Sequence, residues 1–150
     1  MHRKSNVRLV LDTNIVISAL IWGGVPRQLL DLGRNGQVTL FTSSVLLDEL
    51  AEVLERVKFA ALLSSQEITP AFLMQRYGML AKLVKPQPIE RTVRDIDDDV
   101  VIATALAAKA DVIATGDSDL LVLHPWQGIQ ILNAADALQL VQSKIETGSG

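Results

Sequence analysis

The chain has 150 residues, of which 49% are hydrophobic, and it carries a formal net charge of −3 at pH 7. This length predicts one domain with its own hydrophobic core. Because the sequence contains no cysteine, disulfide bonds, thiolate metal sites and cysteine nucleophiles are excluded. The negative charge argues against a protein that binds nucleic acid by general attraction, although divalent cations held by acidic side chains would shift the charge to about −1 or +1.

No apolar run is long enough to cross a membrane, and residues 1–5 lead into a strand rather than into the hydrophobic segment of a signal peptide. We therefore expect a cytoplasmic protein with no membrane partner. The hydrophobic content is hard to bury in one chain of this size, which predicts self-association, most simply as a homodimer. The apolar residues of Ala71–Leu83 are the expected interface.

Short apolar runs alternate with helical patterns along the chain. The runs predicted to form strands are Val7–Leu11, Val38–Thr42, Val112–Ala114 and Ile129–Leu132. Predicted helices cover Ile15–Ile21, about Pro26–Asn35, Val45–Val57, the vicinity of Phe59–Leu63, Pro70–Leu83, Val100–Ala110, and the region from about Ala134 onward. This alternation predicts an α/β fold in which helices cover both faces of a parallel sheet. We expect a single domain over residues 1–145 and a disordered tail at residues 146–150.

Two acidic residues follow predicted strands. Asp12 comes directly after Val7–Leu11, and Asp117 lies two residues after Thr115, at the end of Val112–Ala114. In open parallel sheets, ligands bind beyond the carboxyl ends of the strands, so these carboxylates can converge if their strands are neighbours. Taken alone, Asp12 is equally well explained as a turn or helix-cap residue. In the strand-to-helix turn that begins at Asp12, we expect Thr13 or Asn14 to cap the next helix while Asp12 points into the crevice.

Glu49 lies on the edge of an apolar helical stripe. Its neighbours at helical spacing are apolar, namely Val45, Leu46, Leu50 and Val53. An unpaired carboxylate is costly in such a place, which favours a role in a site. The alternative is a boundary glutamate whose stem covers the core while its head reaches water.

An acidic run, from Asp95 to Asp99, leads into the helix predicted at Val100–Ala110. Acidic residues stabilise a helix N-terminus through its dipole, so some of them need no further function. Asp98 shares a face with Val101, Ile102 and Ala105, and this spacing predicts that Asp98 points towards the buried side. Asp99 is the alternative.

The turn from Thr115 to Asp119 offers two carboxylates and two hydroxyls, although acidic and hydroxyl residues are also ordinary in turns. Together with Asp12, Glu49 and Asp98, this turn predicts a site for a divalent cation bound through oxygen. Zinc chemistry is disfavoured, because the sequence has only two histidines. His2 is in the terminal region, and His124 is expected to be structural or solvated.

These segments resemble those of PIN-domain proteins. The matching phrases are Leu9-Val10-Leu11-Asp12-Thr13-Asn14, the helix of Glu49, the Asp-Asp pair before Ile-Ala-Thr-Ala-Leu-Ala, and Val-Ile-Ala-Thr-Gly-Asp-Ser-Asp-Leu. The resemblance extends from Val7 to about Val141. Ile17-Ser18-Ala19-Leu20 and Arg56-Val57-Lys58-Phe59 further resemble toxins of toxin–antitoxin systems, close to VapC-type toxins. The chain departs from that subgroup at Ile96, where proline is commoner.

The resemblance implies a Rossmann-like α/β/α sandwich that cleaves RNA with Mg²⁺ or Mn²⁺. It also implies a protein antitoxin as a partner. By position, the catalytic acids are Asp12, Glu49, Asp98 and Asp117. Of these, Asp12, Asp98 and Asp117 would bind metal. The supporting residues are Asn14, Thr115 and Asp119.

Two other functions fit the sequence less well. A phosphatase of the haloacid-dehalogenase type needs a second acid two residues after Asp12, where Asn14 stands, and a phosphate-binding lysine, for which Lys109 is the only nearby candidate. A degenerate PIN fold that only binds or scaffolds would have lost one or more acids, and none is lost. Residues for RNA contact are poorly defined. The basic residues are dispersed, and Trp22 is a better candidate for core or interface than for base stacking.

Overall fold

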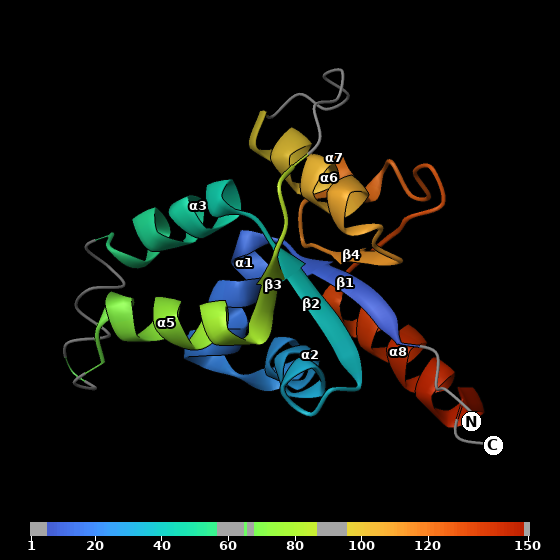
Figure 1. The fold of residues 1–150 in the computed structure, drawn as a ribbon, viewed down its shortest axis with the longest axis horizontal. Coiled ribbons are helices and arrows are strands. Elements are labelled where there is room, and N and C mark those ends of the chain that lie inside the picture. Colours follow the sequence, from blue (N-terminus) through green and yellow to red (C-terminus); the bar gives the residue numbers. More distant parts are fainter. Residues whose placement is uncertain (1–5, 57–64, 66–67, 87–95, 149–150) are drawn as a thin grey trace.

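The computed structural model describes residues 6–56, 65, 68–86 and 96–148, the last range without the side chains of residues 96–98 and 146–148. Its centre is a five-stranded parallel sheet in the order β3-β2-β1-β4-β5 (Figure 1). The strands are β1 (Val7–Leu11), β2 (Val38–Thr42), β3 (Ala81–Leu83), β4 (Val112–Ala114) and β5 (Gln130–Leu132). The order reverses at β1, because β2 and β3 extend the sheet on one side and β4 and β5 extend it on the other.

Helices cover both faces of the sheet, which confirms the predicted α/β sandwich (Figure 1). The segments with most of their buried residues on one face are α1 (Thr13–Ile17), the π-helical turn η1 (Ser18–Trp22), α2 (Gly24–Arg34), α3 (Ser44–Leu54), α5 (Pro70–Leu80) and α8 (Ala134–Gly148). The opposite face is covered by α6 (Ile96–Ala108) and α7 (Ser118–Leu121).

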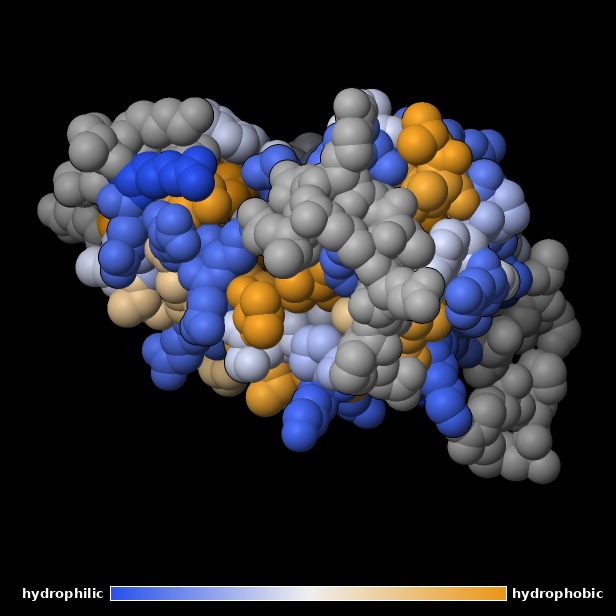
Figure 2. Space-filling model, turned by 90° about the horizontal axis from the view of Figure 1, so that it is seen from above, coloured by the Kyte–Doolittle hydropathy of each residue, from blue (hydrophilic) through white to orange (hydrophobic). Residues whose placement is uncertain are grey.

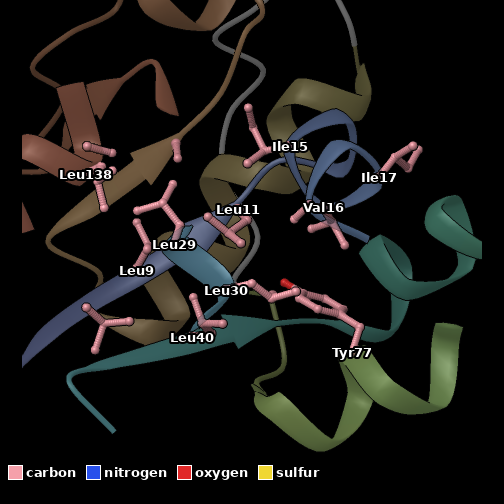
Figure 3. Packing of buried hydrophobic residues seen from close by; sticks show 14 of the residues in the cluster. Leu9, Leu11, Ile15, Val16, Ile17, Leu29, Leu30, Leu40, Tyr77 and Leu138 are labelled. Atoms are coloured by element: carbon pink, nitrogen blue, oxygen red, sulfur yellow. The ribbon is translucent and has the colours of Figure 1, made fainter. Parts of the chain in front are cut away.

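Successive residues of β1 belong to different core clusters. Leu9 and Leu11 pack with Leu29, Leu30 and other residues of one face (Figure 3), whereas Val10 packs with α6 on the other. Side chains alternate across a strand, so burial on both faces requires the nearly continuous apolar runs seen in the sequence.

The structure corrects the C-terminal end of the predicted helix Pro70–Leu83. The helix α5 stops at Leu80, and Ala81–Leu83 form the edge strand β3. Leu40 lies opposite Ala81 in the pairing with β2, and the Val84 N–H donates to the Thr42 carbonyl at 2.8 Å. Alanine, lysine and leucine favour helices, but this preference is outweighed by pairing with an open edge of β2.

Other boundaries shift by a few residues. The first helix begins at Thr13 and changes to a π-helical turn at Ser18, whereas Ile15–Ile21 was predicted as one helix. The last helix continues to Gly148, three residues into the predicted tail. The predicted helix near Phe59–Leu63 lies outside the described residues, and the domain limits stay a prediction. No single described helix has the length and hydrophobicity to cross a membrane. The segment Thr13–Trp22 meets both criteria only when it is joined to α2, and the two are bent by 95°.

Tyr77 is the single tyrosine of the chain and is only 2% exposed. Its ring packs beside Leu30 and Leu40 in the core cluster of Figure 3. The hydroxyl lies near the side chain of Thr42, but no described residue forms a hydrogen bond of normal geometry with it. Burial raises the pKa of the Tyr77 phenol above its ordinary range, because apolar surroundings disfavour the phenolate.

We predict that Tyr77 ionises only when the protein unfolds. Its pKa in the folded state is above the value of about 10 for an unfolded chain. Its contribution to stability is therefore complete below pH ~10 and is lost as the pH rises towards the folded-state pKa. In an alkaline titration, phenolate absorbance should increase together with the loss of helical circular dichroism. Tyr77→Phe should lessen the alkaline loss of stability and, by removing a poorly paired hydroxyl, should be neutral or stabilising at neutral pH. Phenolate in a protein that keeps its helical signal would contradict this.

Candidate functional site

Asp12 and Thr115 meet where the strand order reverses. The strands that precede them are neighbours, with Leu11 opposite Ala114, and the Asp12 N–H donates to the Ala114 carbonyl at 2.9 Å. Asp12 is 8% exposed, and each of its carboxylate oxygens accepts a hydrogen bond. Oδ1 accepts from the Thr13 N–H at 2.8 Å, and Oδ2 accepts from the Thr115 hydroxyl at 2.7 Å. A buried carboxylate is thus held at the carboxyl edge of the sheet, in the crevice where open α/β sheets bind ligands.

Thr115 also orders the turn that follows β4. Its hydroxyl is fully buried and accepts from the Asp117 N–H at 3.0 Å. Asp117 in turn caps α7, because its Oδ1 accepts from the Asp119 N–H at 2.8 Å. Asp117 and Asp119 are both half-buried. One threonine hydroxyl therefore connects the Asp12 carboxylate to the backbone that carries Asp117.

Glu49 is half-buried on α3 and accepts a hydrogen bond from the Thr13 hydroxyl. Since Thr13 directly follows Asp12, this bond brings α3 to the end of β1. From the sequence, Thr13 was considered only as a possible helix cap, and its contact with Glu49 was not predicted. A hydroxyl residue next to a strand-end aspartate was the available signal, but nothing in the pattern identified its partner 36 residues away.

The cap of α1 differs from the prediction. Asp12 itself is the N-cap residue, because its carboxylate accepts from the Thr13 N–H. Asn14 is exposed, and no hydrogen bond in the described part of the chain joins its side chain to Asp12, Glu49 or Thr115. A supporting role for Asn14 stays a prediction.

The first turns of α6 lie at the same edge of the sheet. Thr104 on α6 contacts Ser43, which directly follows β2, and the helix starts two turns before Thr104. Asp98 belongs to this first part of α6, but its side chain lies outside the described residues. The neighbouring Asp99 is 8% exposed. Burial of Asp99 keeps it as an alternative to Asp98 for the acid contributed by α6.

The donor set has the chemistry of a magnesium or manganese site, since carboxylate oxygens are the protein ligands that these ions prefer. The Asp12 and Glu49 carboxylates both accept from neutral donors, which restrict their orientation. Among the side chains that the structure describes, no group of three or more acidic or histidine residues is arranged to hold a metal ion. The described acids fit such a cation by their chemistry, and the contribution of an acid from α6 stays a prediction.

Most described arginines near the core have local partners. Arg27 donates to the Ala19 carbonyl, Arg34 pairs with Asp31, and Arg8 donates to the Ala108 carbonyl. Arg56 instead lines a groove of about 280 Å³ along α3, together with Glu49. Lys58, Arg91 and Arg94 lie outside the described residues. On the face shown in Figure 2, hydrophobic areas lie between hydrophilic ones.

Two aromatic residues considered in the sequence have clear positions. Trp22 is 67% exposed, which excludes the predicted core position and leaves an interface or base stacking. His124 is exposed, and its Nδ1 accepts from the Ile131 N–H at 2.9 Å, which agrees with the expected structural role.

Comparison with known proteins agrees with this geometry. Residues 8–119 match the PIN domain family, a range that includes Asp12, Glu49, Asp117 and Asp119. The chain is also 31% identical over 122 residues to an uncharacterized protein of Methanocaldococcus jannaschii, and the alignment covers 81% of this chain and 77% of that protein. The chain therefore belongs to the PIN domain family. PIN domains are generally nucleases, and they generally use divalent metals such as Mg²⁺.

We predict that Thr115→Val destabilises the protein by about 1–3 kcal/mol, because it removes the donor to Oδ2 of the buried Asp12 carboxylate. It also removes the acceptor of the Asp117 N–H. Thr115→Ser keeps the hydroxyl and is the matched control. Denaturant unfolding at neutral pH measures both. Equal stability of the valine and serine variants would show that the hydroxyl is unimportant to the fold.

Proposed function

We propose that this chain is an endoribonuclease that hydrolyses RNA phosphodiester bonds with bound Mg²⁺ or Mn²⁺, and that it acts in the cytoplasm as the toxin of a toxin–antitoxin pair. One observation carries the nuclease proposal. The Thr115 hydroxyl holds a buried Asp12 carboxylate at the reversal point of the sheet, in a chain that belongs to the PIN domain family. RNA is the proposed substrate, and a protein antitoxin is the proposed regulatory partner.

Asp12, Asp98 and Asp117 are the proposed metal ligands. A divalent cation bound there would lower the pKa of a coordinated water and would neutralise charge on the phosphoryl oxygens. Thr115 would keep the Asp12 carboxylate oriented towards the cation, since it already donates to Oδ2. Glu49 would orient the attacking water or hold a second cation, and the Thr13 hydroxyl would fix its carboxylate. Asn14 and Asp119 would support the ligands.

The phosphatase alternative gains nothing from the structure. Its general acid would have to stand two residues after Asp12, and that residue is the exposed Asn14. A binding or scaffolding role without catalysis is separated from the nuclease by the response to metal. A nuclease site should be stabilised by a divalent cation, whereas a scaffold with no use for the cation should ignore it.

We predict that Mn²⁺ raises the melting temperature of the wild-type protein and supports cleavage of RNA. A free Mn²⁺ concentration of about a hundred times its dissociation constant adds roughly 2.7 kcal/mol to the free energy of unfolding. Asp12→Asn should abolish both effects. Glu49→Gln should lose cleavage rate while keeping much of the stabilisation, because Glu49 is assigned to the water or to a second cation. Asp119→Asn is the control expected to change least.

Thermal unfolding with and without Mn²⁺ and cleavage of a labelled RNA measure these outcomes. Unchanged stability of the wild-type protein in millimolar Mn²⁺ would argue for the scaffold. Asp98→Asn and Asp99→Asn, compared in the same assays, identify the acid of α6. If only Asp99→Asn abolishes cleavage, the assignment of Asp98 is wrong by one residue and the nuclease proposal stands.

The proposed homodimer uses the outward side of α5 and β3. Phe72, Met79 and Leu83 are 49%, 80% and 64% exposed, whereas Leu73 and Tyr77 face the core. Phe72 and Met79 are seven residues apart, close to two helical turns, so they form one stripe on α5, and Leu83 follows on β3. The surface beside this stripe contains a depression of about 180 Å³ lined by Arg34, Arg76, Met79 and Leu80.

We predict that sedimentation at tens of micromolar shows a dimer and that Met79→Glu dissociates it, because a charge buried in an apolar interface is costly. Val122→Glu is a matched control, since Val122 is 77% exposed but lies just after α7, away from the α5 stripe. A monomeric wild-type protein, or equal dissociation by both substitutions, would contradict an interface on α5.

A further inference from the structure

A buried pair of hydroxyls connects α3 to α6. Ser43 precedes α3 and Thr104 lies within α6; both are 0% exposed, and their oxygens are 2.9 Å apart. Each hydroxyl has a second partner. The Ser43 oxygen accepts from the Leu46 N–H at 3.3 Å, and the Thr104 hydroxyl donates to the Val100 carbonyl at 2.8 Å. The two oxygens therefore belong to a chain of hydrogen bonds that runs from one helix to the other.

The direction of this chain follows from proton counting. A hydroxyl donates one proton, and a carbonyl can only accept, so the Thr104 proton is committed to Val100. Ser43 must then donate to Thr104, while its own oxygen accepts from Leu46. The order is Leu46 N–H, Ser43 hydroxyl, Thr104 hydroxyl and Val100 carbonyl. Every member has a defined partner, so the arrangement has one orientation.

Both ends of the chain lie close to acidic residues of the proposed site. Leu46 is in the first turn of α3, one turn before Glu49. Val100 directly follows Asp98 and Asp99 in the first part of α6. Because Ser43 follows the last residue of β2, the hydroxyl pair lies at the carboxyl edge of the sheet, as Asp12 does.

Leu46, Val101 and Ala105, which are near the pair in the sequence, belong to the apolar core cluster of this face of the sheet. Apolar packing alone stabilises two helices but tolerates small displacements between them, whereas a hydrogen bond restricts the distance between its two atoms. The bond between the two hydroxyls adds little stability by itself, since replacing both partners of a buried hydrogen bond by apolar groups can be nearly neutral. The capping bond from the Leu46 N–H to Ser43 stabilises α3 alone and does not explain the contact with Thr104. The presence of both hydroxyls is better explained by the geometry that they impose.

We propose that Ser43 and Thr104 are positioning residues, whose hydroxyl pair fixes the separation of α3 and α6 and thereby the separation of Glu49 from the acid of α6. This inference rests on the proposed metal-dependent function. Mg²⁺ requires ligands at about 2.0–2.1 Å in nearly octahedral geometry. A small displacement of either helix would therefore weaken metal binding even if every acid remained in place.

Direct binding of Mn²⁺ in the absence of RNA tests the proposal, with free Mn²⁺ measured by its electron paramagnetic resonance signal. Thr104→Val keeps the shape of the side chain but removes the oxygen, and it should weaken Mn²⁺ binding by roughly 10- to 100-fold, as loss of groups that support metal ligands does. Ser43→Ala should have an effect of similar size. Thr104→Ser keeps the hydroxyl and should bind Mn²⁺ about as tightly as the wild-type protein.

A double variant and an unrelated core variant separate positioning from general loss of stability. Ser43→Ala combined with Thr104→Val should bind Mn²⁺ no more weakly than the weaker single variant, because either change already breaks the chain. Val141→Ala is the matched control. Val141 is also 0% exposed, but it lies on α8 in the core cluster on the opposite face. It should lower the melting temperature without changing the Mn²⁺ affinity.

The possible results distinguish this proposal from the function on which it rests. If the wild-type protein binds Mn²⁺ and the folded Ser43 and Thr104 variants bind it equally well, the positioning role is wrong and the nuclease proposal stands. If Val141→Ala weakens binding as much as Thr104→Val, affinity merely follows stability, and the positioning role is again wrong. A wild-type protein that binds no Mn²⁺ would overturn both proposals.

Discussion

Strand β1 is hydrogen-bonded to β2 on one edge and to β4 on the other, and it is buried by helices on both faces. Its end is therefore inside the protein, and the next residue, Asp12, places its carboxylate there. Burial of a carboxylate is unfavourable unless hydrogen bonds replace those to water. The groups within reach are those that start α1 and those that follow β4, and they supply the Thr13 N–H and the Thr115 hydroxyl. The central position of β1 thus determines which residues build the site.

Hydroxyl groups connect neighbouring elements at three places along this edge of the sheet. Thr115 connects β1 to the turn after β4, Thr13 connects α1 to Glu49, and Ser43 connects α3 to α6. An arginine or lysine in these places would also hold a carboxylate, but its positive charge would compete with a bound cation. Thr13 and Thr115 are neutral donors, so their hydrogen bonds restrict the orientation of the Asp12 and Glu49 carboxylates without adding positive charge. These contacts are made within the fold and need no bound ligand.

Features encoded by local pattern could be predicted from the sequence. The apolar runs of β1, β2 and β4 and the strand-end position of Asp12 are of this kind. The strand β3 could not be predicted, because Ala81–Leu83 have no strand preference and become extended only beside β2. The bonds Thr13–Glu49 and Ser43–Thr104 join residues 36 and 61 positions apart, so no local pattern contains them. Helical periodicity also cannot choose between Asp98 and Asp99, because every residue from Val101 to Ala105 is buried and no single face is distinguished.

The two outer strands of the sheet are short. Both outer strands, β3 and β5, have three residues, whereas β1 and β2 have five. An outer strand exposes unpaired N–H and carbonyl groups, and a long, flat one can recruit a strand from another molecule and start aggregation. Here the exposed edge offers few such groups, and Lys82 places a charge in the middle of β3. Continuous growth of the sheet from one molecule to the next is therefore disfavoured. The short edges of this sheet therefore make poor templates for fibres.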